Sequence, residues 1–389
     1  MTFSNKLFSQ NTNSQFFDAL DGRFDVSDYL SENAYGFLPV PIIITDPAVD
    51  GGLGVIGLFF HETDEEKDKR LDAMRQAESE AARHLMPPGV SAIAIAGTGN
   101  DSWFAGGGHM GFFKQGSIRY SGGGGYGDVN LDYFGSGNVN LSRPIELKTK
   151  ASAMIQTLKF KVASSSFFLG LSQRYINAEI SPNSFGDFDA ILPPDFADEL
   201  QKLLTLQVTT SGLGLNLEFD TRDNIFSPLE GFQYKLDSIW YRDTFGSDIE
   251  YELISFTGLN YWTITNHWRL GLRIDSDYAR SDNLLPPFAT PSISLRGIPA
   301  MRYQGDLAGA VETEVTWQID NRWGLTGFLG AGRASNSTSE LSDAPSQVTQ
   351  GVGFRYQVAR RYGFDMGLDI AWGPEESVWY ITAGSAWGR

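Results

Sequence analysis

Hydrophobic and polar residues alternate along much of the second half of the chain. The segment 362–372 shows this most clearly, because Tyr, Phe, Met, Leu, Ile and Trp alternate there with Gly, Asp and Ala. The segments 213–220, 268–277, 312–320 and 352–358 have the same period of two. Successive side chains of a β-strand point to opposite faces, so this pattern predicts strands with one apolar face and one polar face.

Strands of this kind occur both in soluble β-sandwiches and in membrane β-barrels, and two features favour the barrel. The alternating segments reach about 10–14 residues, whereas soluble strands usually have about 5–6 and a tilted membrane strand needs about 9–11. Aromatic residues also recur near the segment ends, as in the girdles of barrels, for example at Trp240, Trp268, Trp323 and Trp372. We therefore predict an all-β fold, namely a transmembrane antiparallel β-barrel.

The number of strands follows from the segments and from the even count of bacterial barrels. Fifteen strand-like segments are found, at about 51–61, 90–99, 102–113, 117–134, 146–163, 167–180, 204–220, 231–243, 249–264, 268–280, 307–320, 323–334, 348–359, 362–373 and 378–388. Either 51–61 lies outside the wall, which leaves fourteen strands, or the Gly-rich segment 117–134 contains a turn, which gives sixteen. We favour sixteen.

The connections between these segments differ in length, and barrels place short turns in the periplasm and long loops outside. The long connections 181–203, 281–306 and 335–347 should therefore face outward. Residues 62–86 are rich in Glu, Lys, Ala and Arg and precede two prolines, which predicts a helix in an outer loop. The barrel is expected to occupy residues 51–389, after a short periplasmic or plug segment at 1–50.

Composition narrows the possible partners and the compartment. The 47 acidic residues against 30 basic ones give a net charge of -17, which disfavours nucleic acid because phosphate binding needs clustered Lys and Arg. The absence of Cys is compatible with an envelope protein. The first residues lack the charged start and apolar core of a signal peptide, so we expect the given sequence to be a mature form from which the signal peptide has been removed.

No arrangement typical of an enzyme is found in the sequence. His61, His84, His109 and His267 lack metal-ligand spacing, and no G-x-S-x-G elbow is present. We therefore predict no catalytic residue, no cofactor and no metal site. The mid-strand His109 is expected to face the lumen. Asp365 and Asp369 should share one inner face and solvate the lumen.

A polar turn near the middle of the chain provides the first family resemblance. The residues from Asp220 to Asn224 read D-T-R-D-N, and Pro228 and Gly231 follow, which suits a turn between two strands. This pattern resembles the signature of the BamA/TamA outer-membrane assembly superfamily, which also holds the two-partner-secretion transporters. The motif positions are Asp220, Arg222, Asp223, Pro228 and Gly231.

A second pattern, Leu-Arg-Gly-Ile at 295–298, lies in the long loop before the strand that carries Glu312 and Glu314. It is similar to the (V/I)-R-G-(F/Y) loop motif of the same superfamily. The resemblance implies that the loop folds back into the barrel and that Arg296, followed by Gly297, pairs with carboxylates on the inner wall. Alternation places both glutamates inward, and Glu314 is the closer match to the family position. The alternative is an arginine in an exposed loop.

Two further patterns resemble the same superfamily. Phe328, Gly330 and Gly332 match its F-x-D-x-G strand motif with Gly in place of Asp, so one half of the usual acidic clamp is expected to be missing. The last segment, from Trp379 to Trp387, resembles the C-terminal recognition strand of outer-membrane proteins. About 50 residues precede the first predicted strand, too few for a POTRA domain, so the resemblance is to a branch without POTRA domains.

The resemblance implies an integral protein of a bacterial-type outer membrane. Such a protein is expected to assist the insertion or translocation of proteins or lipids, together with periplasmic or outer-membrane partner proteins. Its other expected partners are outer-membrane lipid and lipopolysaccharide. A weakly paired line between the first and last strands would allow lateral opening. The alternative is a channel or a structural barrel gated by its inner loop.

Overall fold

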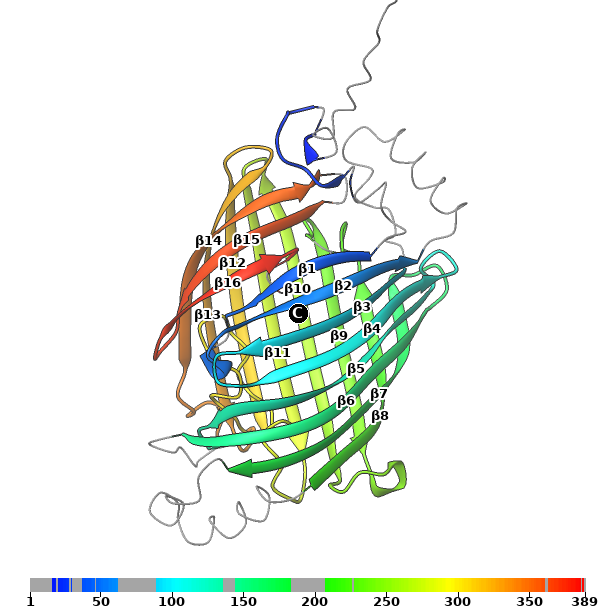
Figure 1. Cartoon of the computed structure of the whole chain (residues 1–389), viewed down its shortest axis with the longest axis vertical. Coiled ribbons are helices and arrows are strands. Elements are labelled where there is room, and N and C mark those ends of the chain that lie inside the picture. The colour runs from blue at the N-terminus through cyan, green and yellow to red at the C-terminus, as the bar shows by residue number, and fades with distance from the viewer. Residues whose placement is uncertain are drawn as a thin grey trace, which may run out of the picture.

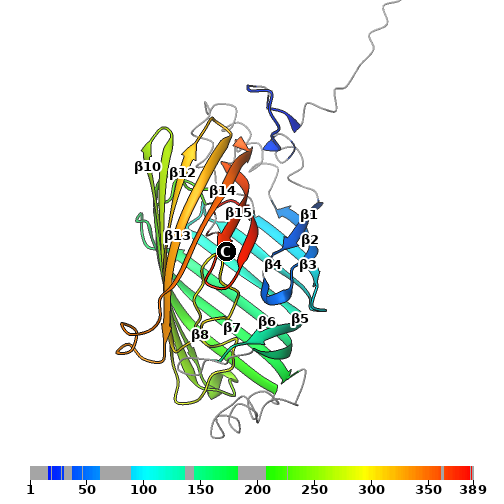
Figure 2. The same cartoon turned by 90° about the vertical axis from the view of Figure 1, so that its left-hand side faces the viewer.

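Sixteen antiparallel strands form one sheet, in which each strand is hydrogen-bonded to its neighbours in sequence order from β1 to β16. The computed structural model describes residues 16–18, 20–27, 29, 37–45, 47–61, 89–135, 144–182, 207–225, 227–360, 363–385 and 387. The sheet curls into a nearly closed barrel (Figure 1, Figure 2). This confirms the predicted barrel and the count of sixteen. No helix among the described residues is long and apolar enough to span a membrane.

The strand bounds are β1 Phe37–Ile44, β2 Gly52–His61, β3 Gly89–Thr98, β4 Trp103–Phe113, β5 Ile118–Tyr133, β6 Ile145–Lys161, β7 Phe167–Pro182, β8 Gln207–Asp220, β9 Gly231–Tyr241, β10 Tyr251–Thr265, β11 Trp268–Arg280, β12 Leu307–Gln318, β13 Trp323–Ser335, β14 Gln347–Ala359, β15 Phe364–Trp372 and β16 Ser377–Ala383. Among the described residues, 3-10 helices lie at Pro47–Val49 (η2) and Asp243–Phe245 (η4). No hydrogen-bonded register joins β1 to β16 in the described part of the chain. We call the line between these two edge strands the seam.

The sixteenth strand is not where the sequence placed it. The predicted turn within 117–134 is wrong, because β5 runs without a break and pairs glycine to glycine with β4, for example Gly107 with Gly124. A Cβ on Gly123 would lie 2.9 Å from the carbonyl oxygen of Gly107, so these strands approach more closely than side chains would allow. The additional strand is β1, which begins before the predicted barrel boundary at residue 51. Its two prolines suit an edge strand.

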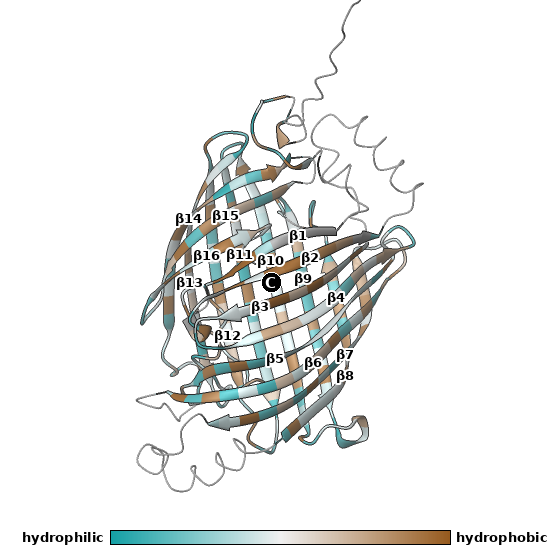
Figure 3. Cartoon of the chain, viewed as in Figure 1, coloured by the Kyte–Doolittle hydropathy of each residue, from teal (hydrophilic) through white to brown (hydrophobic). Residues whose placement is uncertain are grey.

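The strand register gives the barrel wall an apolar outer face and a more polar inner face. Leu169 and Leu171 of β7 pair with Leu217 and Leu215 of β8, and all four side chains are exposed on the outer face. The next residue after Leu217, Glu218, points inward and is 2% exposed. Figure 3 shows apolar and polar residues mixed along the strands in this way. The outer face is therefore suited to lipid and much of the inner face to polar contacts.

One chain of polar side chains departs from this rule, because it lies on the outer face of β2 to β7. His109 belongs to it, so the expectation that this histidine faces the lumen is wrong. The ring atom Nδ1 of His109 lies 3.0 Å from Ser91 Oγ. The chain links His61, Ser91, His109, Tyr120, Gln156 and Gln173 through four hydrogen bonds and the ring contact of His109 with Tyr120. Polar groups in lipid are costly unless they are paired, and here each has a partner.

The two ends of the barrel differ in their connections. The short turns 114–117, 162–166, 266–267 and 319–322 lie at the end where β12 meets β13, which short-turn topology assigns to the periplasm. The long connections 281–306 and 336–346 lie at the opposite end. The predicted helix at 62–86 and most of the predicted loop 181–203 lie outside the described residues. The flanking His61 and Gly89 lie at the short-turn end, which contradicts an outer-loop position for 62–86.

The described part of the N-terminal segment, residues 16–29, lies against these short turns (Figure 1). Arg322, in the β12–β13 connection, is fully buried and binds Asp18 at 2.7 Å, Asp21 at 2.6 Å and Asp25 at 2.5 Å. Arg360 binds the same Asp18. Burial alone would lower the pKa of the Arg322 guanidinium, but Asp21 and Asp25 raise it above its ordinary value, so Arg322 stays charged.

We expect Arg322→Ala to release the N-terminal segment, because three carboxylates would lose their shared cation. Limited proteolysis should then cut within residues 16–29 while the barrel stays resistant. Arg23→Ala is the matched control, since it removes an ion pair with Asp320 whose side chains are 44% and 37% exposed; such pairs contribute about 0–1 kcal/mol. Unchanged protection of the segment in Arg322→Ala would contradict this account.

Candidate functional site

The long connection between β11 and β12, residues 281–306, has an apolar core that packs against the inner wall. Ile293, Leu295 and Ile298 are buried together with Ala310 of β12. An antiparallel bridge between Ser292 and Gln304 closes the tip of the loop. The apolar residues on both sides of Arg296 therefore hold this arginine inside the barrel, where burial removes it from water.

The guanidinium of Arg296, 1% exposed, is surrounded by three carboxylates. Its Nη2 lies 2.8 Å from Glu312 Oε1, and its Nη1 lies 2.8 Å from Glu314 Oε2 and 2.7 Å from Asp369 Oδ2. Arg355 binds Asp369 and, at 3.4 Å, Glu314. We call these five residues the Arg296 cluster. With two cations against three anions, it carries one excess negative charge.

The three carboxylates fix the protonation state of Arg296. Burial alone would lower the pKa of its guanidinium, but Glu314, Glu312 and Asp369 raise it above the ordinary value. The arginine therefore remains charged at neutral pH. Its guanidinium carbon also lies 3.5 Å from the centre of the Phe328 ring, a cation–π contact.

The strand motif on β13 provides space for the loop. A Cβ on Gly330 would lie 2.9 Å from Leu295 Cδ2 and 2.9 Å from Thr349 Oγ1. A Cβ on Gly332 would lie 2.6 Å from Ile293 Cγ2. The structure thus brings Phe328, Gly330 and Gly332 together with the loop residues. At position 330 the space that an aspartate would need is filled by Leu295.

Asp369 of β15 supplies the carboxylate that β13 lacks. The expectation that Asp369 merely solvates the lumen is wrong, because its side chain is fully buried and binds both Arg296 and Arg355. Gly353 of β14 is its register partner and leaves room for the carboxylate. Alternation places both Asp369 and Arg355 on the inward face of neighbouring strands, and this is the signal in the sequence that could have indicated the pair.

The same loop holds the β15–β16 hairpin, which borders the seam. Gly297 has a positive φ of 91°, and its N–H donates to the hydroxyl of Tyr380 on β16 at 2.9 Å. In the hairpin turn, Glu375 accepts from Arg302 Nε at 2.9 Å and from the Tyr303 hydroxyl at 3.0 Å. Arg302 also lies 4.1 Å from the ring of Phe134, next to β5. The loop therefore contacts both the hairpin that borders the seam and the wall at the end of β5.

The C-terminal residues fold into the lumen rather than continuing the last strand. β16 ends at Ala383, so the predicted strand through Trp387 is wrong; of the two tryptophans, Trp379 lies on the outer face of β16 and Trp387 lies beyond its end. Gly384, with a φ of 78°, turns the chain inward, and Trp387 packs on Tyr261 with ring centres 5.8 Å apart. The indole N–H of Trp387 donates to Glu312. Gly271 leaves room for this ring.

The Asp220–Asn224 motif builds the turn between β8 and β9. Asp220 binds Arg222 at 3.0 Å and Arg119 of β5 at 3.1 Å. Asp223 Oδ1 accepts from the backbone N–H of Leu229 at 2.9 Å. Gly231 has a φ of 105°, and a Cβ there would lie 2.4 Å from a backbone carbonyl oxygen. The motif is thus a turn that its own side chains close, and Pro228 faces the lumen.

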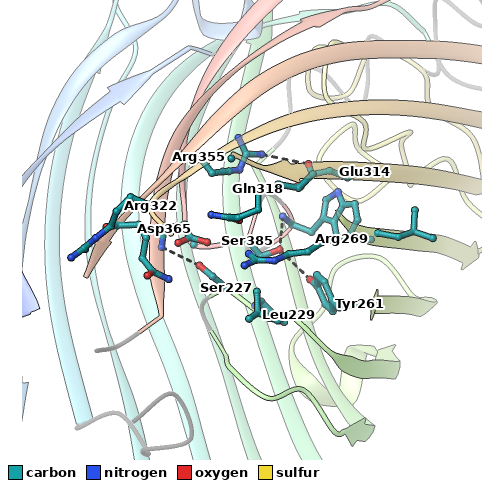
Figure 4. A pocket seen from close by; sticks show the side chains of 18 residues that line it. Ser227, Leu229, Tyr261, Arg269, Glu314, Gln318, Arg322, Arg355, Asp365 and Ser385 are labelled. Carbon is teal, nitrogen blue, oxygen red and sulfur yellow. Dashed lines mark hydrogen bonds and ion pairs between the residues drawn. The ribbon is translucent and has the colours of Figure 1, made fainter. Parts of the chain in front are cut away.

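A cavity of about 70 Å³ lies below the Arg296 cluster. Figure 4 shows side chains from the β8–β9 turn, from several strands and from the C-terminal residues converging on it, among them Ser227, Tyr261, Gln318 and Ser385. The cavity has room for a few waters but not for a substrate. Within the described residues, no group of three or more His, Cys, Asp or Glu side chains is placed to hold a metal ion.

No protein-family model matches the sequence, and no curated protein is similar to it in sequence. Solved structures do resemble the fold. BamA from Haemophilus ducreyi lacking POTRA domains 1–3 superposes with a TM-score of 0.58 at 10% identity, covering 90% of this chain and 70% of that one. CdiB from Escherichia coli gives 0.55 at 11% identity and CdiB from Acinetobacter baumannii 0.54 at 10%; both alignments cover 89% of this chain but only 62% and 59% of those chains.

The sixteen-stranded sheet and its similarity to the BamA structure define the fold as a β-barrel of the outer-membrane type. More narrowly, the chain has the barrel fold of the BamA and CdiB proteins. At about 10% identity the likeness is one of fold, and the chain spans less than two thirds of the length of the CdiB chains.

We expect Arg296→Ala to destabilise the barrel by about 3–5 kcal/mol, because it leaves buried carboxylates without their cation. The loss should appear as a lower temperature of unfolding in detergent, read from the heat-dependent shift of the band on a gel. Arg333→Ala is the control, since this arginine donates to the loop carbonyls of Leu341 and Ser342 and has no ion pair with another described residue. Equal unfolding temperatures for the two variants would contradict a stabilising Arg296 cluster.

We expect Gly330→Asp, which restores the family pattern, to lower the unfolding temperature. The new side chain would collide with Leu295 and Thr349 and add a negative charge to a cluster that already has an excess. Gly327→Ala on the same strand should be neutral, because nothing lies within 4 Å of a Cβ there. Adding Leu295→Ala should partly rescue Gly330→Asp. A gain in stability from Gly330→Asp alone would show that the space is not limiting.

Proposed function

We propose that this barrel assists the insertion or translocation of proteins or lipids at the outer membrane, together with partner proteins. The observation that carries the proposal is the seam, where β1 and β16 end the sheet without pairing to one another in the described part of the chain. Backbone N–H and C=O groups at such an edge cost free energy in lipid unless another strand pairs with them. An incoming client strand would supply that partner.

The position of the long loop supports this proposal. The loop binds the β15–β16 hairpin through Gly297 and through Arg302, and it is tied to β12 and β15 through Arg296. A barrel whose seam opens loses the stabilisation of a closed sheet, so an internal tie is needed to hold the rest of the wall together. The Arg296 cluster would provide this tie, through Glu312 of β12 and Asp369 of β15, while β16 moves.

The likeness to BamA and CdiB barrels supports an outer-membrane location, with outer-membrane lipid and lipopolysaccharide around the barrel. We propose periplasmic or outer-membrane proteins as further partners. Identifying the proteins that co-purify from the native membrane would name them.

The proposal is tested by reconstituting the full chain into liposomes with an unfolded barrel protein as client. We expect client folding to accelerate. One cysteine in β1 and one in β16, joined by a reducible crosslink, should abolish the acceleration, and reduction should restore it; the chain has no native Cys to interfere. Two cysteines joined within the β12–β13 pair are the matched control. No acceleration, with or without co-purified proteins, would refute the proposal.

A channel gated by the inner loop is the second candidate, favoured by the charged inner wall around Arg273, Glu312 and Arg355. Planar-bilayer recording separates the two. A steady conductance that rises in Arg296→Ala would support a pore that the loop closes, whereas a silent barrel that accelerates client folding would support the first proposal.

A further inference from the structure

The inner wall of the barrel changes in chemical character around its circumference. On β11 to β15 the inward side chains include the buried, paired charges of Arg273, Glu312, Arg355 and Asp369. On β2, β3 and β4 the described inward positions carry no charge. Their larger apolar members are Ile56, Leu58, Val90, Phe104, Met110 and Phe112, which share one face by register. Figure 3 shows β2 and β3 largely brown and white.

A cavity of about 680 Å³ lies against this apolar wall over β3 to β6. Val90, Ala92, Met110, Ala153 and Ile155 line it, together with glycines of β4 and β5. Ile155 is 48% exposed and Phe104 is 38% exposed, although both point inward. Apolar area of this extent is unfavourable in a water-filled lumen, so the wall is suited to an apolar occupant.

This apolar wall continues to the seam. Ile42 and Ile44 of β1 pair with Gly54 and Gly52 on the inner face, while the neighbouring Ile43 is exposed on the outer face. The edge strand is therefore apolar on both faces. A hydrocarbon chain could pass from the bilayer around β1 to the inner wall without meeting a charged side chain of β1 to β4, which makes membrane lipid the occupant that the surface suits.

A basic cluster lies at the periplasmic end of the same cavity. Arg119 and Lys159 pair across β5 and β6, two residues beyond the cavity-lining Ser121 and Thr157. They bind Glu218, and Lys235 of β9 is the register partner of that glutamate. Arg119, Lys159 and Arg222 are paired with Glu218 and Asp220, an excess of one positive charge. Arg119 Nε is buried without a hydrogen-bond partner among the described residues.

We propose that the inner face of β2 to β6 binds a phospholipid that enters through the seam, with its acyl chains in the apolar cavity and its phosphate at the basic cluster. Arginine and lysine next to a phosphate form strong charge-assisted hydrogen bonds. The inference rests on the proposed role in moving proteins or lipids, and it names phospholipid as a substrate class. Lipopolysaccharide, which has more acyl chains, is the larger alternative that the test separates.

The test uses three single-cysteine variants of the full chain, each carrying the same environment-sensitive fluorophore. A92C lines the cavity, I93C is its outward-facing neighbour, and T316C lies on the charged inner wall. The proteins are placed in nanodiscs of phosphatidylglycerol whose acyl chains carry bromine, a contact quencher. We expect A92C to be quenched nearly as strongly as I93C and far more strongly than T316C. Quenching of A92C no stronger than that of T316C would overturn the proposal.

Two further substitutions test the parts of the site. Ile155→Asp places a charge in the cavity, and we expect it to remove the quenching of A92C without changing that of I93C. Arg119→Gln combined with Lys159→Gln should weaken the quenching of A92C, whereas Lys148→Gln, at an outward ion pair with Asp128, should not. Quenching of A92C that persists in Ile155→Asp would overturn the proposal. The unchanged I93C signal shows that each variant is folded in the bilayer.

Two comparisons identify the occupant. Brominated lipopolysaccharide in place of phosphatidylglycerol should not quench A92C, and quenching by lipopolysaccharide alone would overturn the assignment to phospholipid. The assignment to phospholipid would also be overturned if brominated phospholipid does not quench A92C and A92C instead crosslinks to an unfolded client strand. Quenching is measured without client, so the two assays are independent. Loss of the quenching of A92C together with intact acceleration of client folding refutes the lipid site alone. Intact quenching without accelerated client folding refutes only the protein-insertion role.

Discussion

A backbone amide that faces hydrocarbon must find its hydrogen-bond partner within the protein, and most of this structure follows from that constraint. Each of β2 to β15 has a neighbour on both sides, so its ladder is complete. β1 and β16 each have one neighbour, and they are among the shortest strands. The long loop contacts the hairpin that borders this exception and the wall at the end of β5, through Glu375 and Phe134. The loop thus holds the hairpin at one edge of this exception to the rest of the wall.

The loop, the wall and the C-terminal residues share single carboxylates, so they cannot be stable independently. Glu312 accepts hydrogen bonds from both Arg296 and Trp387, and Asp369 binds both Arg296 and Arg355. Removing one partner changes the charge balance and the hydrogen bonds of all the others, and the costs are therefore not additive. Displacing the loop would loosen the C-terminal residues at the same time.

Alternation was sufficient to predict β6 to β15, because one face of each meets lipid and the other meets polar groups. It failed for β1, where both faces are apolar and two prolines interrupt the pattern, and the missing strand was assigned to β5 instead. It failed for His109 because β4 consists mostly of glycine and aromatic residues, so its sequence does not show which face of the strand is polar. The motif residues around Arg296 could be anticipated from the resemblance. Asp369 and Trp387 could not, since their roles depend on which strands meet across the lumen.

The outward polar chain from His61 to Gln173 has a consequence for folding. The chain connects six consecutive strands, and each link requires that two particular residues stand at one height in the wall. A slip of one residue in any of these strands would turn its polar member inward and leave the neighbouring amide or imidazole alone in hydrocarbon. Glycine-rich strands specify their alignment weakly, because they offer few side chains to match. In this half of the barrel, the polar chain therefore favours the native strand register over registers shifted by one residue.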